Sequence, residues 1–501
     1  MHGDLHVPVS GITCDSRRTA RGDLFVALKG TKQDGGLFIR DAANRGACAA
    51  VGEDPRENGA VRTYVRVRDS RKALAVLAEN FFDRPSRDLR LVGVTGTSGK
   101  TTTTLLLESI FKCENEPVGV LGTLAYRWAG KSMSAPMTTP HSLDLQKMFY
   151  EMREDRVSTV VMEVSSHALA LGRVAGCSFK AGVFTNLSQD HLDFHCDMES
   201  YFQAKAGLFR DHMERLGESS VAVLNVDDPY GERLLAELGN GAWSYSAAGK
   251  KARVSVKRAD VSPSGIQAEL AAPGGDIAIR SRLVGRLNLY NLLAAATTAL
   301  ALDVPGESIV RGLEAVSTVD GRLQRVAIPE RFGFDVVVDY AHKPDAMEKG
   351  LKCLREMTRK RLLVVFGCGG DRDRGKRPIM GEIAARLGDL VVLTSDNPRN
   401  EAPEAILDEI EAGVKRCSFP RLGPRGSQDA DRGYAVEPDR RKAIRLALSW
   451  AGPGDLVFIG GKGHETYQIV GKEVLPFDDR QVVRDWLDCQ ERPSVTKGSG
   501  K

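Results

Sequence analysis

A short segment rich in glycine and hydroxyl side chains has the composition of a phosphate-binding loop. It reads Thr-Gly-Thr-Ser-Gly-Lys-Thr-Thr over residues 95–102, directly after the apolar run 91–94. A strand, a glycine turn and a helix start in this order let backbone N–H groups and the positive end of a helix dipole face an anion. Lys100 would then reach the β- and γ-phosphates of a nucleotide, and the Thr101 hydroxyl would ligate Mg²⁺. The strict pattern has glycine where this chain has Val94, and an ordinary glycine turn is the alternative.

Three polar residues downstream stand where they could complete such a site. Glu163 ends an apolar strand-like run, and ligands gather at the carboxyl ends of parallel strands. His191 follows the next apolar run, together with several aspartates. Lys205 interrupts an otherwise apolar helical stretch, and a buried, neutral amine can react with CO₂ to form an anionic carbamate. The alternatives are a helix-capping acid, a structural histidine and a surface lysine.

The elements that must position these groups follow from the alternation of apolar strands with helical patterns. This alternation begins at residue 91 and resumes at 334, which predicts parallel sheets with crossover helices. Residues 251–284 are expected to form a small antiparallel insert, and 291–302 a helix rich in alanine. We therefore expect an α/β protein of three domains, 1–88, 89–321 and 322–492, with a disordered tail at 493–501.

Composition narrows the class of protein. The chain has 501 residues, 42% of them hydrophobic, and a net charge of only +4, which argues against a dedicated nucleic-acid binder. Its nine cysteines include no Cys-x-x-Cys pair, which is typical of a reduced intracellular protein. No apolar run approaches the length of about 18 residues that a membrane span needs. These features predict a cytoplasmic protein without a transmembrane segment.

Four motifs together resemble those of the Mur ligases, the ATP-dependent amide ligases of bacterial peptidoglycan assembly. They are the loop at 95–102, Glu-Val-Ser-Ser-His at 163–167, Asn-Leu-Ser-Gln-Asp-His-Leu-Asp at 186–193 and Glu-Ser-Tyr-Phe-Gln-Ala-Lys at 199–205. The resemblance covers essentially the whole chain. It implies a central P-loop parallel-sheet ATPase domain between a small N-terminal α/β domain and a C-terminal Rossmann-like α/β domain.

The resemblance implies an ATP site with two Mg²⁺ ions. Thr101 and Glu163 would hold one ion, and Glu163, His191 and Lys205 as a CO₂-derived carbamate would hold the second. The implied catalytic residues are Lys100, Glu163, His191, Lys205, Arg322, Asp339 and His342. The implied ATP-binding residues are Gly96, Thr97, Ser98, Gly99, Lys100, Thr101, Thr102, Asn288, Asn291 and Arg322. Arg322, Asp339 and His342 belong to segments that would close the third domain on ATP and exclude water.

The resemblance also implies a nucleotide-linked acceptor, UDP-N-acetylmuramoyl-L-alanyl-D-glutamate, bound by the first two domains. The residues expected to contact it are Cys14, Ser16, Thr31, Lys32, Gln33, Thr138, Thr139, Ser165 and Arg173. The chain departs from the family pattern at two positions, with Leu171 where relatives often carry Gln and Met137 where they often carry Asn.

Within the family, the chain resembles the members that add meso-diaminopimelate as the third residue of the stem peptide. An arginine in a turn that proline rigidifies can bind a carboxylate bidentately, and diaminopimelate differs from lysine by one carboxylate and its α-carbon. Arg399 is therefore the expected discriminator. The residues expected around this amino acid are Arg372, Asp396, Asn397, Pro398, Arg399, Gly461 and Glu465.

Three other functions remain open on the sequence. The first is the same ligase acting on L-lysine, which Arg399 disfavours. The second is another ligase of the superfamily, such as a folylpolyglutamate synthetase or the enzyme that adds D-alanyl-D-alanine. The third is a nucleotide-binding scaffold without catalysis, which would not need Glu163, His191 and Lys205 together. We expect a monomer with small-molecule substrates and no nucleic-acid partner.

Overall fold

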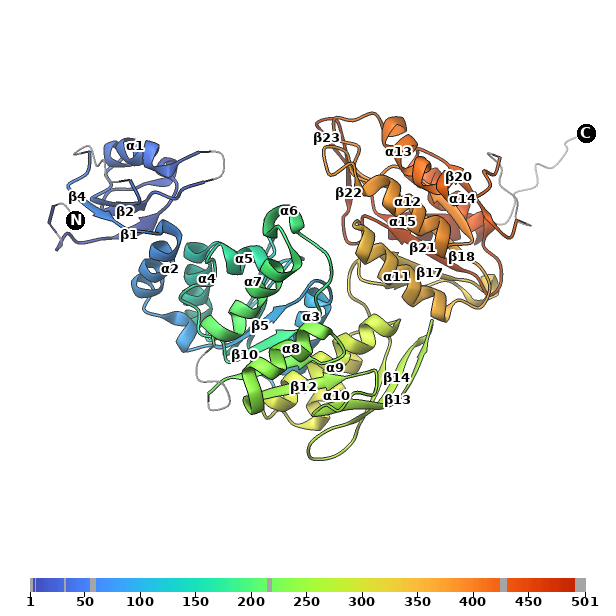
Figure 1. Cartoon of the computed structure of the whole chain (residues 1–501), viewed down its shortest axis with the longest axis horizontal. Coiled ribbons are helices and arrows are strands. Elements are labelled where there is room, and N and C mark those ends of the chain that lie inside the picture. Colours follow the sequence, from blue (N-terminus) through green and yellow to red (C-terminus); the bar gives the residue numbers. More distant parts are fainter. Residues whose placement is uncertain are drawn as a thin grey trace, which may run out of the picture. The chain divides into compact units, whose positions relative to one another are not determined.

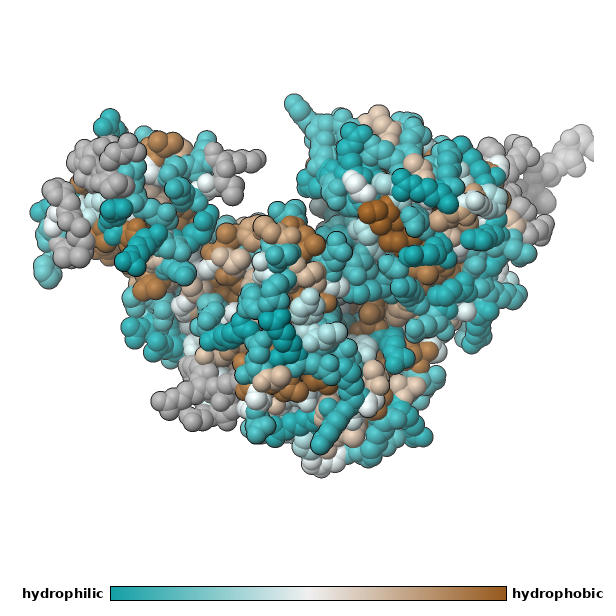
Figure 2. Space-filling view, in the orientation of Figure 1, coloured by the Kyte–Doolittle hydropathy of each residue, from teal (hydrophilic) through white to brown (hydrophobic). Residues whose placement is uncertain are grey.

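The computed structural model describes residues 3–4, 6–30, 33–54, 60–213, 219–423 and 430–491, so the predicted tail lies outside the described residues. Two compact units are present, residues 1–255 with 293–312 and residues 256–292 with 313–501 (Figure 1). The face drawn in Figure 2 is mainly hydrophilic, with scattered apolar patches. Within the described residues, no helix is both long enough and apolar enough to span a bilayer.

The first unit begins with a small parallel sheet. Its neighbouring strands are β1 (Gly11–Thr13), β2 (Asp23–Val26), β3 (Ala49–Gly52) and β4 (Thr63–Arg66). Side chains of β2 alternate between the faces, because Phe25 packs into one apolar cluster and Leu24 and Val26 into another. Helices α1 (Ile39–Asn44) and α2 (Ser70–Phe81) contribute Ala42 and Leu74 to these clusters.

A larger sheet forms the centre of the first unit. Eight of its eleven strands, in spatial order, are β12 (Ala242–Ser246), β11 (Val221–Asn225), β10 (Ala181–Phe184), β5 (Arg90–Thr95), β9 (Thr159–Glu163), β6 (Val118–Leu121), β7 (Tyr126–Trp128) and β8 (Lys131–Met133). Pairing is parallel from β12 to β6 and antiparallel from β6 to β8. Because β10, β5 and β9 are neighbours, the segments that follow Phe184, Thr95 and Glu163 meet at one edge.

Helices pack against this central sheet and carry several candidate residues. They are α3 (Lys100–Cys113), α4 (Ser142–Glu154), α5 (Ser166–Ala170), α6 (Leu192–His195), α7 (Met198–Asp211) and α8 (Pro229–Leu238). Phe149 of α4 and Phe202 of α7 are fully buried in the same apolar cluster as Val160 of β9. This packing fixes the helices on which the candidate lysines and histidines lie.

Three elements contain residues of both units: β13 (Val254–Ser262), α9 (Arg286–Ala301) and α10 (Gly306–Ala315). The predicted antiparallel insert is confirmed for β14 (Gly265–Ala271) and β15 (Ile277–Ser281), whereas β13 starts in parallel with β12. Helix α9 begins before the predicted start at 291. The Asn288 amide donates to the Val284 carbonyl at 2.8 Å, and this local bond accommodates a polar side chain in the first turn of the helix.

The second unit is a doubly wound α/β sandwich. Its strands, in spatial order, are β16 (Gln324–Val326), β17 (Asp335–Asp339), β21 (Leu456–Gly460), β18 (Leu362–Phe366), β19 (Leu390–Leu393) and β20 (Gly433–Val436). All pairings are parallel except that of β16 with β17. Phe366 and Val365 of β18 belong to different apolar clusters, so both faces of the sheet are buried.

Helices cover the two faces of this second sheet. The apolar cluster on one face includes residues of α11 (Pro344–Met357), α12 (Lys376–Leu387) and α13 (Pro403–Arg416). The cluster on the other face includes residues of α14 (Arg440–Trp450) and α15 (Asp479–Glu491). A hairpin of β22 (Tyr467–Val470) and β23 (Glu473–Pro476) follows β21.

Candidate active site

The phosphate loop links β5 to α3, as its sequence predicts. Gly96 has φ +145° and Gly99, the residue before α3, has φ +88°, which are conformations that favour glycine. A Cβ on Gly96 would lie only 1.9 Å from Thr185 Oγ1. The segment after β10 braces the loop, because Thr185 Oγ1 donates to the Ser98 carbonyl at 2.6 Å and Asn186 Oδ1 accepts from the Ser98 N–H at 3.0 Å. Thr185 and Asn186 were not identified from the sequence as part of the site.

Two lysines converge on this loop. Lys100 Nζ donates to the carbonyls of Gly96 and Thr97, each at 2.9 Å. Lys205 is only 1% exposed, and its Nζ donates to the same Gly96 carbonyl at 2.9 Å. Its ammonium also lies 4.7 Å from the ring centroid of Tyr201, one helical turn earlier on α7. Because both nitrogens contact one oxygen, they lie within about 6 Å of each other, and two like charges so close to the buried Lys205 are electrostatically unfavourable.

Glu163 lies buried at the same edge of the sheet. Its carboxylate accepts hydrogen bonds from Thr101 Oγ1 at 3.1 Å and from both the N–H and the hydroxyl of Thr123, at 2.8 and 3.2 Å. A carboxylate beside two hydroxyls is a set of hard oxygen ligands, which suits Mg²⁺. Thr123 was not singled out from the sequence, although a polar residue just after the strand β6 is the kind of signal that would have found it.

The histidines gather beside Tyr201. The ring centroid of His167 lies 4.7 Å from that of His191 and 5.6 Å from that of His195, which itself lies 5.1 Å from the Tyr201 ring. His191 has φ +55° at the start of α6, and its Nε2 is 3.4 Å from an Asp190 carboxylate oxygen. Within the described ranges, no group of three or more His, Cys, Asp or Glu side chains is arranged to hold a metal ion. The predicted second set of ligands also relies on a modified lysine, and it stays a prediction.

The residues predicted for the acceptor fall into two places. The first place is next to Glu163, where Thr139 Oγ1 donates to the Glu163 carbonyl at 2.9 Å and lies 3.3 Å from Ser165 Oγ. Arg173 donates to the Thr139 carbonyl at 3.2 Å. The Thr138 hydroxyl is 3.2 Å from that of Thr123. Met137, one of the two departures, has its sulfur 3.1 Å from the Arg173 guanidinium. Leu171 is half-buried at the end of α5.

The second place is the small N-terminal sheet. Ser16 lines a cavity of about 400 Å³ with Arg17, Asp41, Asn44 and Arg45. Cys14 and Gln33 are exposed on the same part of the chain, and the predicted residues Thr31 and Lys32 lie outside the described residues. The structure therefore offers one basic cavity near the predicted uridine contacts.

A second polar site lies in the second unit, where β19 and β21 end. Asp396 to Arg399 follow β19, and Gly461 and Glu465 follow β21. Lys462 is fully buried between them, and its Nζ donates to Asn397 Oδ1 at 2.9 Å and to Glu465 Oε2 at 3.2 Å. Asn397 Nδ2 also donates to Glu465 Oε2, at 3.0 Å. The contacts of Lys462 were not predicted, because its partners on the Asp396 side lie more than sixty residues earlier in the chain.

A buried ion pair supports the ends of the two strands. Arg440 and Asp479 are both about 0% exposed and are joined by two hydrogen bonds of 2.7 Å. Arg440 also donates to the carbonyls of Ser395 and Gly460 at 3.3 and 2.9 Å. A buried pair whose remaining donors are satisfied in this way fixes geometry more than it adds stability.

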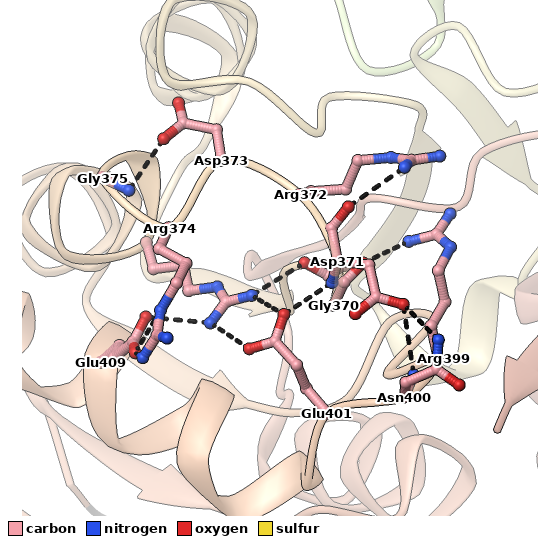
Figure 3. A network of polar contacts seen from close by, with 12 residues as sticks. Gly370, Asp371, Arg372, Asp373, Arg374, Gly375, Arg399, Asn400, Glu401 and Glu409 are labelled. Carbon is pink, nitrogen blue, oxygen red and sulfur yellow. Dashed lines mark hydrogen bonds and ion pairs between the residues drawn. The ribbon is translucent and has the colours of Figure 1, made fainter.

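The two predicted arginines of this site lie on neighbouring loops, Arg372 on the loop after β18 and Arg399 on the loop after β19 (Figure 3). Arg399 has φ +51°, and its guanidinium donates to the Gly370 carbonyl at 2.8 Å. Arg372 is exposed, and its guanidinium donates to the Asp371 carbonyl at 3.1 Å. The structure thus brings together the two arginines that the sequence assigned to amino-acid binding.

The remaining predicted residues also belong to the second unit. The Asp339 carboxylate accepts from the N–H groups of Leu323 and Ala341 at 2.7 and 2.8 Å, and burial raises its pKa. The Arg322 guanidinium lies 5.1 Å from the ring centroid of Tyr340. Asn291 is buried on α9, and its amide donates to Asn288 Oδ1 at 3.1 Å. The phosphate loop belongs to the first unit.

Acidification is expected to destabilise the fold through His342. Burial lowers the pKa of His342 from 6.5 to about 4, and its Nδ1 lies 2.8 Å from the Tyr340 carbonyl. Between these two values the unfolded chain binds more protons than the folded one, so the free energy of unfolding decreases as the pH falls from 6.5 to 4. The contribution of His342 is at most roughly 3 kcal/mol.

Urea denaturation of the wild type and of His342→Gln at several pH values across this window measures the effect. The variant is expected to lose part of the pH dependence, while His464, whose pKa burial also lowers to about 4, accounts for part of the remainder. An unchanged pH dependence in the variant contradicts this assignment.

Comparisons with known proteins show which family the chain belongs to. Three Mur ligase profiles match: the Mur ligase family, catalytic domain at residues 8–82, the Mur ligase middle domain at 94–299 and the Mur ligase, glutamate ligase domain at 321–463. The chain belongs to the Mur ligase family.

Relatives with one shared name match over nearly the full length. A UDP-N-acetylmuramoyl-L-alanyl-D-glutamate–2,6-diaminopimelate ligase of Geobacter metallireducens is 46% identical over 486 residues, which cover 96% of this chain and 94% of the relative. Its counterpart in Gloeobacter violaceus is 48% identical over 482 residues, with the same coverage. These identities are high enough for a shared fold throughout.

Solved structures confirm the expected α/β fold. A structure of a ligase of the same name covers 97% of this chain and 96% of its own, with a TM-score of 0.70 and 32% identity. The MurF ligase of Thermotoga maritima in complex with ADP has a TM-score of 0.61 at 20% identity, covering 97% of this chain and 100% of its own, and supports the fold alone.

Proposed function

We propose that the protein is an ADP-forming amide ligase that joins meso-2,6-diaminopimelate to UDP-N-acetylmuramoyl-L-alanyl-D-glutamate in peptidoglycan precursor synthesis. The observation that carries the proposal is Arg399, which stands two residues after Asn397, the hydrogen-bond partner of Glu465, in a chain whose full-length relatives bear this enzyme's name. Because ATP and nucleotide-linked sugars are cytoplasmic metabolites, we propose a cytoplasmic enzyme that acts as a monomer.

ATP would bind at the phosphate loop. Lys100 would exchange the carbonyls of Gly96 and Thr97 for oxygens of the β- and γ-phosphates, and the N-terminus of α3 would add backbone N–H groups. From the family resemblance, Asn288 and Asn291 would approach the adenine and Arg322 the phosphates. Asp339 and His342 would shape the segment that accompanies Arg322, since Asp339 holds Leu323 and Ala341 in place.

The residues at Glu163 fit Mg²⁺. Thr101 and Glu163, 3.1 Å apart, would hold one ion, and Glu163, His191 and Lys205 as a carbamate would hold the second. Bound Mg²⁺ would neutralise charge on the transferred phosphoryl group. The carbamate is supported by the two ammonium groups at the Gly96 carbonyl, because its formation replaces the buried cation of Lys205 with an anion that Lys100 attracts.

The reaction would proceed in two steps without a covalent enzyme intermediate. The D-glutamyl side-chain carboxylate attacks the γ-phosphorus of ATP, which forms an acyl phosphate and releases ADP. The uncharged amine of diaminopimelate then attacks the acyl carbon, the C–O bond to phosphate breaks, and the amine loses a proton as the amide forms. Thr139 donates to the Glu163 carbonyl and contacts Arg173 and Ser165, and these residues, with Thr138, would hold the dipeptide carboxylates near the γ-phosphate.

The amino acid would bind where β19 and β21 end. Arg399 and Arg372 would bind the carboxylate that distinguishes diaminopimelate from lysine. Glu465, oriented by Asn397 and Lys462, would accept from an ammonium group of the substrate. This division of charge suits an amino acid with two ammonium and two carboxylate groups.

Phosphate release by the purified protein tests the proposal. The protein is mixed with ATP, Mg²⁺ and UDP-N-acetylmuramoyl-L-alanyl-D-glutamate, and meso-diaminopimelate or L-lysine is added separately. We expect release that depends on both acceptor and diaminopimelate. Release with lysine but not with diaminopimelate would support a ligase activity and contradict the proposed specificity. No release with either amino acid would favour another ligase of the superfamily or a non-catalytic nucleotide-binding scaffold.

A further inference from the structure

A buried arginine with two carboxylate partners lies beneath the loop that carries Arg372. Arg377, in the first turn of α12, is 0% exposed. Its guanidinium makes two hydrogen bonds to Glu401, at 2.8 and 2.9 Å, and one to Glu409, at 2.9 Å. It also donates to the Gly369 carbonyl at 3.3 Å. None of these residues was expected at the amino-acid site, and their placement in the structure gives them a role there.

The two glutamates differ in what else they hold. Glu401 accepts a hydrogen bond from the backbone N–H of Asp371 at 2.6 Å, while Arg377 donates to the Gly369 carbonyl. The pair Arg377–Glu401 therefore holds both ends of the turn 369–371. Glu409 instead accepts from the exposed guanidinium of Arg374, with Nε at 2.9 Å. Only Glu401 therefore connects the buried arginine to the backbone N–H of the turn 369–371.

This turn is also clasped by the segment that contains Arg399. The Asn400 amide donates to the Asp371 carboxylate at 2.7 Å. A Cβ on Gly370 would lie only 1.9 Å from the Pro398 carbonyl oxygen, so the two backbones approach as closely as glycine permits. The Gly370 carbonyl accepts a hydrogen bond from the Arg399 guanidinium at 2.8 Å. Arg372 directly follows Asp371, whose N–H is bound by Glu401. Both specificity arginines thus depend on the position of one three-residue turn.

We propose that Glu401 is a positioning residue for amino-acid selection: it fixes the turn 369–371 and thereby places the guanidinium groups of Arg399 and Arg372 for the carboxylate of the incoming amino acid. The identity of that amino acid rests on the proposed function. Glu401 does not itself touch the substrate.

The contacts explain why a carboxylate is needed at this position. Each oxygen of Glu401 accepts from a guanidinium or a backbone N–H, and these bonds, chiefly those from Arg377, lower the pKa of Glu401 to about 2. A glutamine of the same shape must turn an NH₂ group toward one of these donors, which loses a charge-assisted bond and leaves a donor facing a donor. The turn would then shift away from Arg399.

The test compares Glu401→Gln with Glu409→Gln. The two variants are matched because each removes one negative charge that faces the Arg377 guanidinium. For Glu401→Gln we expect the KM for diaminopimelate to rise about 10- to 100-fold, as for a lost charged hydrogen bond. The KM values for ATP and the UDP-linked acceptor are expected to stay within about twofold of wild type, and selectivity over L-lysine to fall. For Glu409→Gln we expect less than a threefold change in any of these values, at a similar melting temperature.

A lighter variant guards against a folding failure. Asn400→Ala removes only the side-chain bond to Asp371, and we expect a smaller rise in the KM for diaminopimelate in the same direction. Should Glu401→Gln not fold, the absence of any such rise in a folded Asn400→Ala protein overturns the proposal.

Two results with folded variants would also overturn the positioning role. One is an equal rise in the KM for diaminopimelate in both glutamine variants, and the other is a parallel rise in all three KM values. The wild type is assayed first: release with lysine moves the comparison to the KM for lysine, whereas no release with either amino acid overturns both the proposed function and this role. A wild type that is active with diaminopimelate leaves the proposed function intact whatever the variants show.

Discussion

Replacing Lys205 with alanine is expected to lower kcat by about three orders of magnitude or more, with little change in the KM for diaminopimelate. Lys205 is almost fully buried against the Gly96 carbonyl of the phosphate loop, and it lies far along the chain from the proposed amino-acid site. As a carbamate it would supply anionic oxygens to Mg²⁺, so its loss would remove stabilisation that is made in the transition state. Phosphate release under saturating substrates measures kcat.

Two controls separate a carbamate from a simple ammonium. Lys205→Arg keeps a positive charge but cannot form the carbamate under these conditions, so we expect it to be nearly as inactive as the alanine variant. Formate or acetate added to Lys205→Ala is expected to restore part of the activity by placing a carboxylate in the space left by the side chain. An arginine variant with wild-type activity, or an alanine variant with full activity, would contradict the carbamate.

Replacing Arg399 with alanine is expected to lower kcat/KM for diaminopimelate by about 100-fold and to change kcat/KM for L-lysine far less. The reason is that a bidentate, charge-assisted contact with a carboxylate is worth several kcal/mol only for the substrate that carries that carboxylate. The ratio of the two kcat/KM values is the measurement, because a general loss of folded protein lowers both alike.

Arg374→Ala provides the matched control for this experiment. Arg374 lies on the same loop as Arg372, but its guanidinium pairs with Glu409 at the surface. The loss of Arg374 is therefore expected to leave the ratio of the two kcat/KM values unchanged. The assignment of Arg399 is contradicted if the ratio is the same in Arg399→Ala as in the wild type.

The phosphate loop could be predicted from the sequence because its chemistry is local. Strand, glycine turn, Lys100 and Thr101 are contiguous, and each acts through backbone geometry that these residue types dictate. The position of Glu163 beside Thr101 followed from the rule that neighbouring parallel strands end at one edge, and the pairing of β5 with β9 agrees with it. The α/β fold followed from the same alternation of strands and helices.

The support beneath the sites could not be predicted in this way. Arg377, Glu401 and Glu409 are charged residues on or near two helices, and by pattern each is an ordinary surface residue. Only the packing of α12 against α13 buries the guanidinium and requires carboxylates around it. The convergence of Lys100 and Lys205 on one carbonyl is equally invisible in the sequence, because their nitrogens meet through the packing of α7 near β5.

The backbone of Arg399 has a consequence for how this enzyme could change over evolutionary time. Its φ of +51° is a conformation that costs a side chain other than glycine or asparagine about 1 kcal/mol. A mutation to glycine or asparagine there would relieve this cost and would also remove the guanidinium. Under the role proposed for Arg399, selection for a more stable fold and selection for the right cell-wall amino acid would act in opposite directions at this one codon. A lineage that came to add a different amino acid to its stem peptide could substitute position 399 without first destabilising its fold.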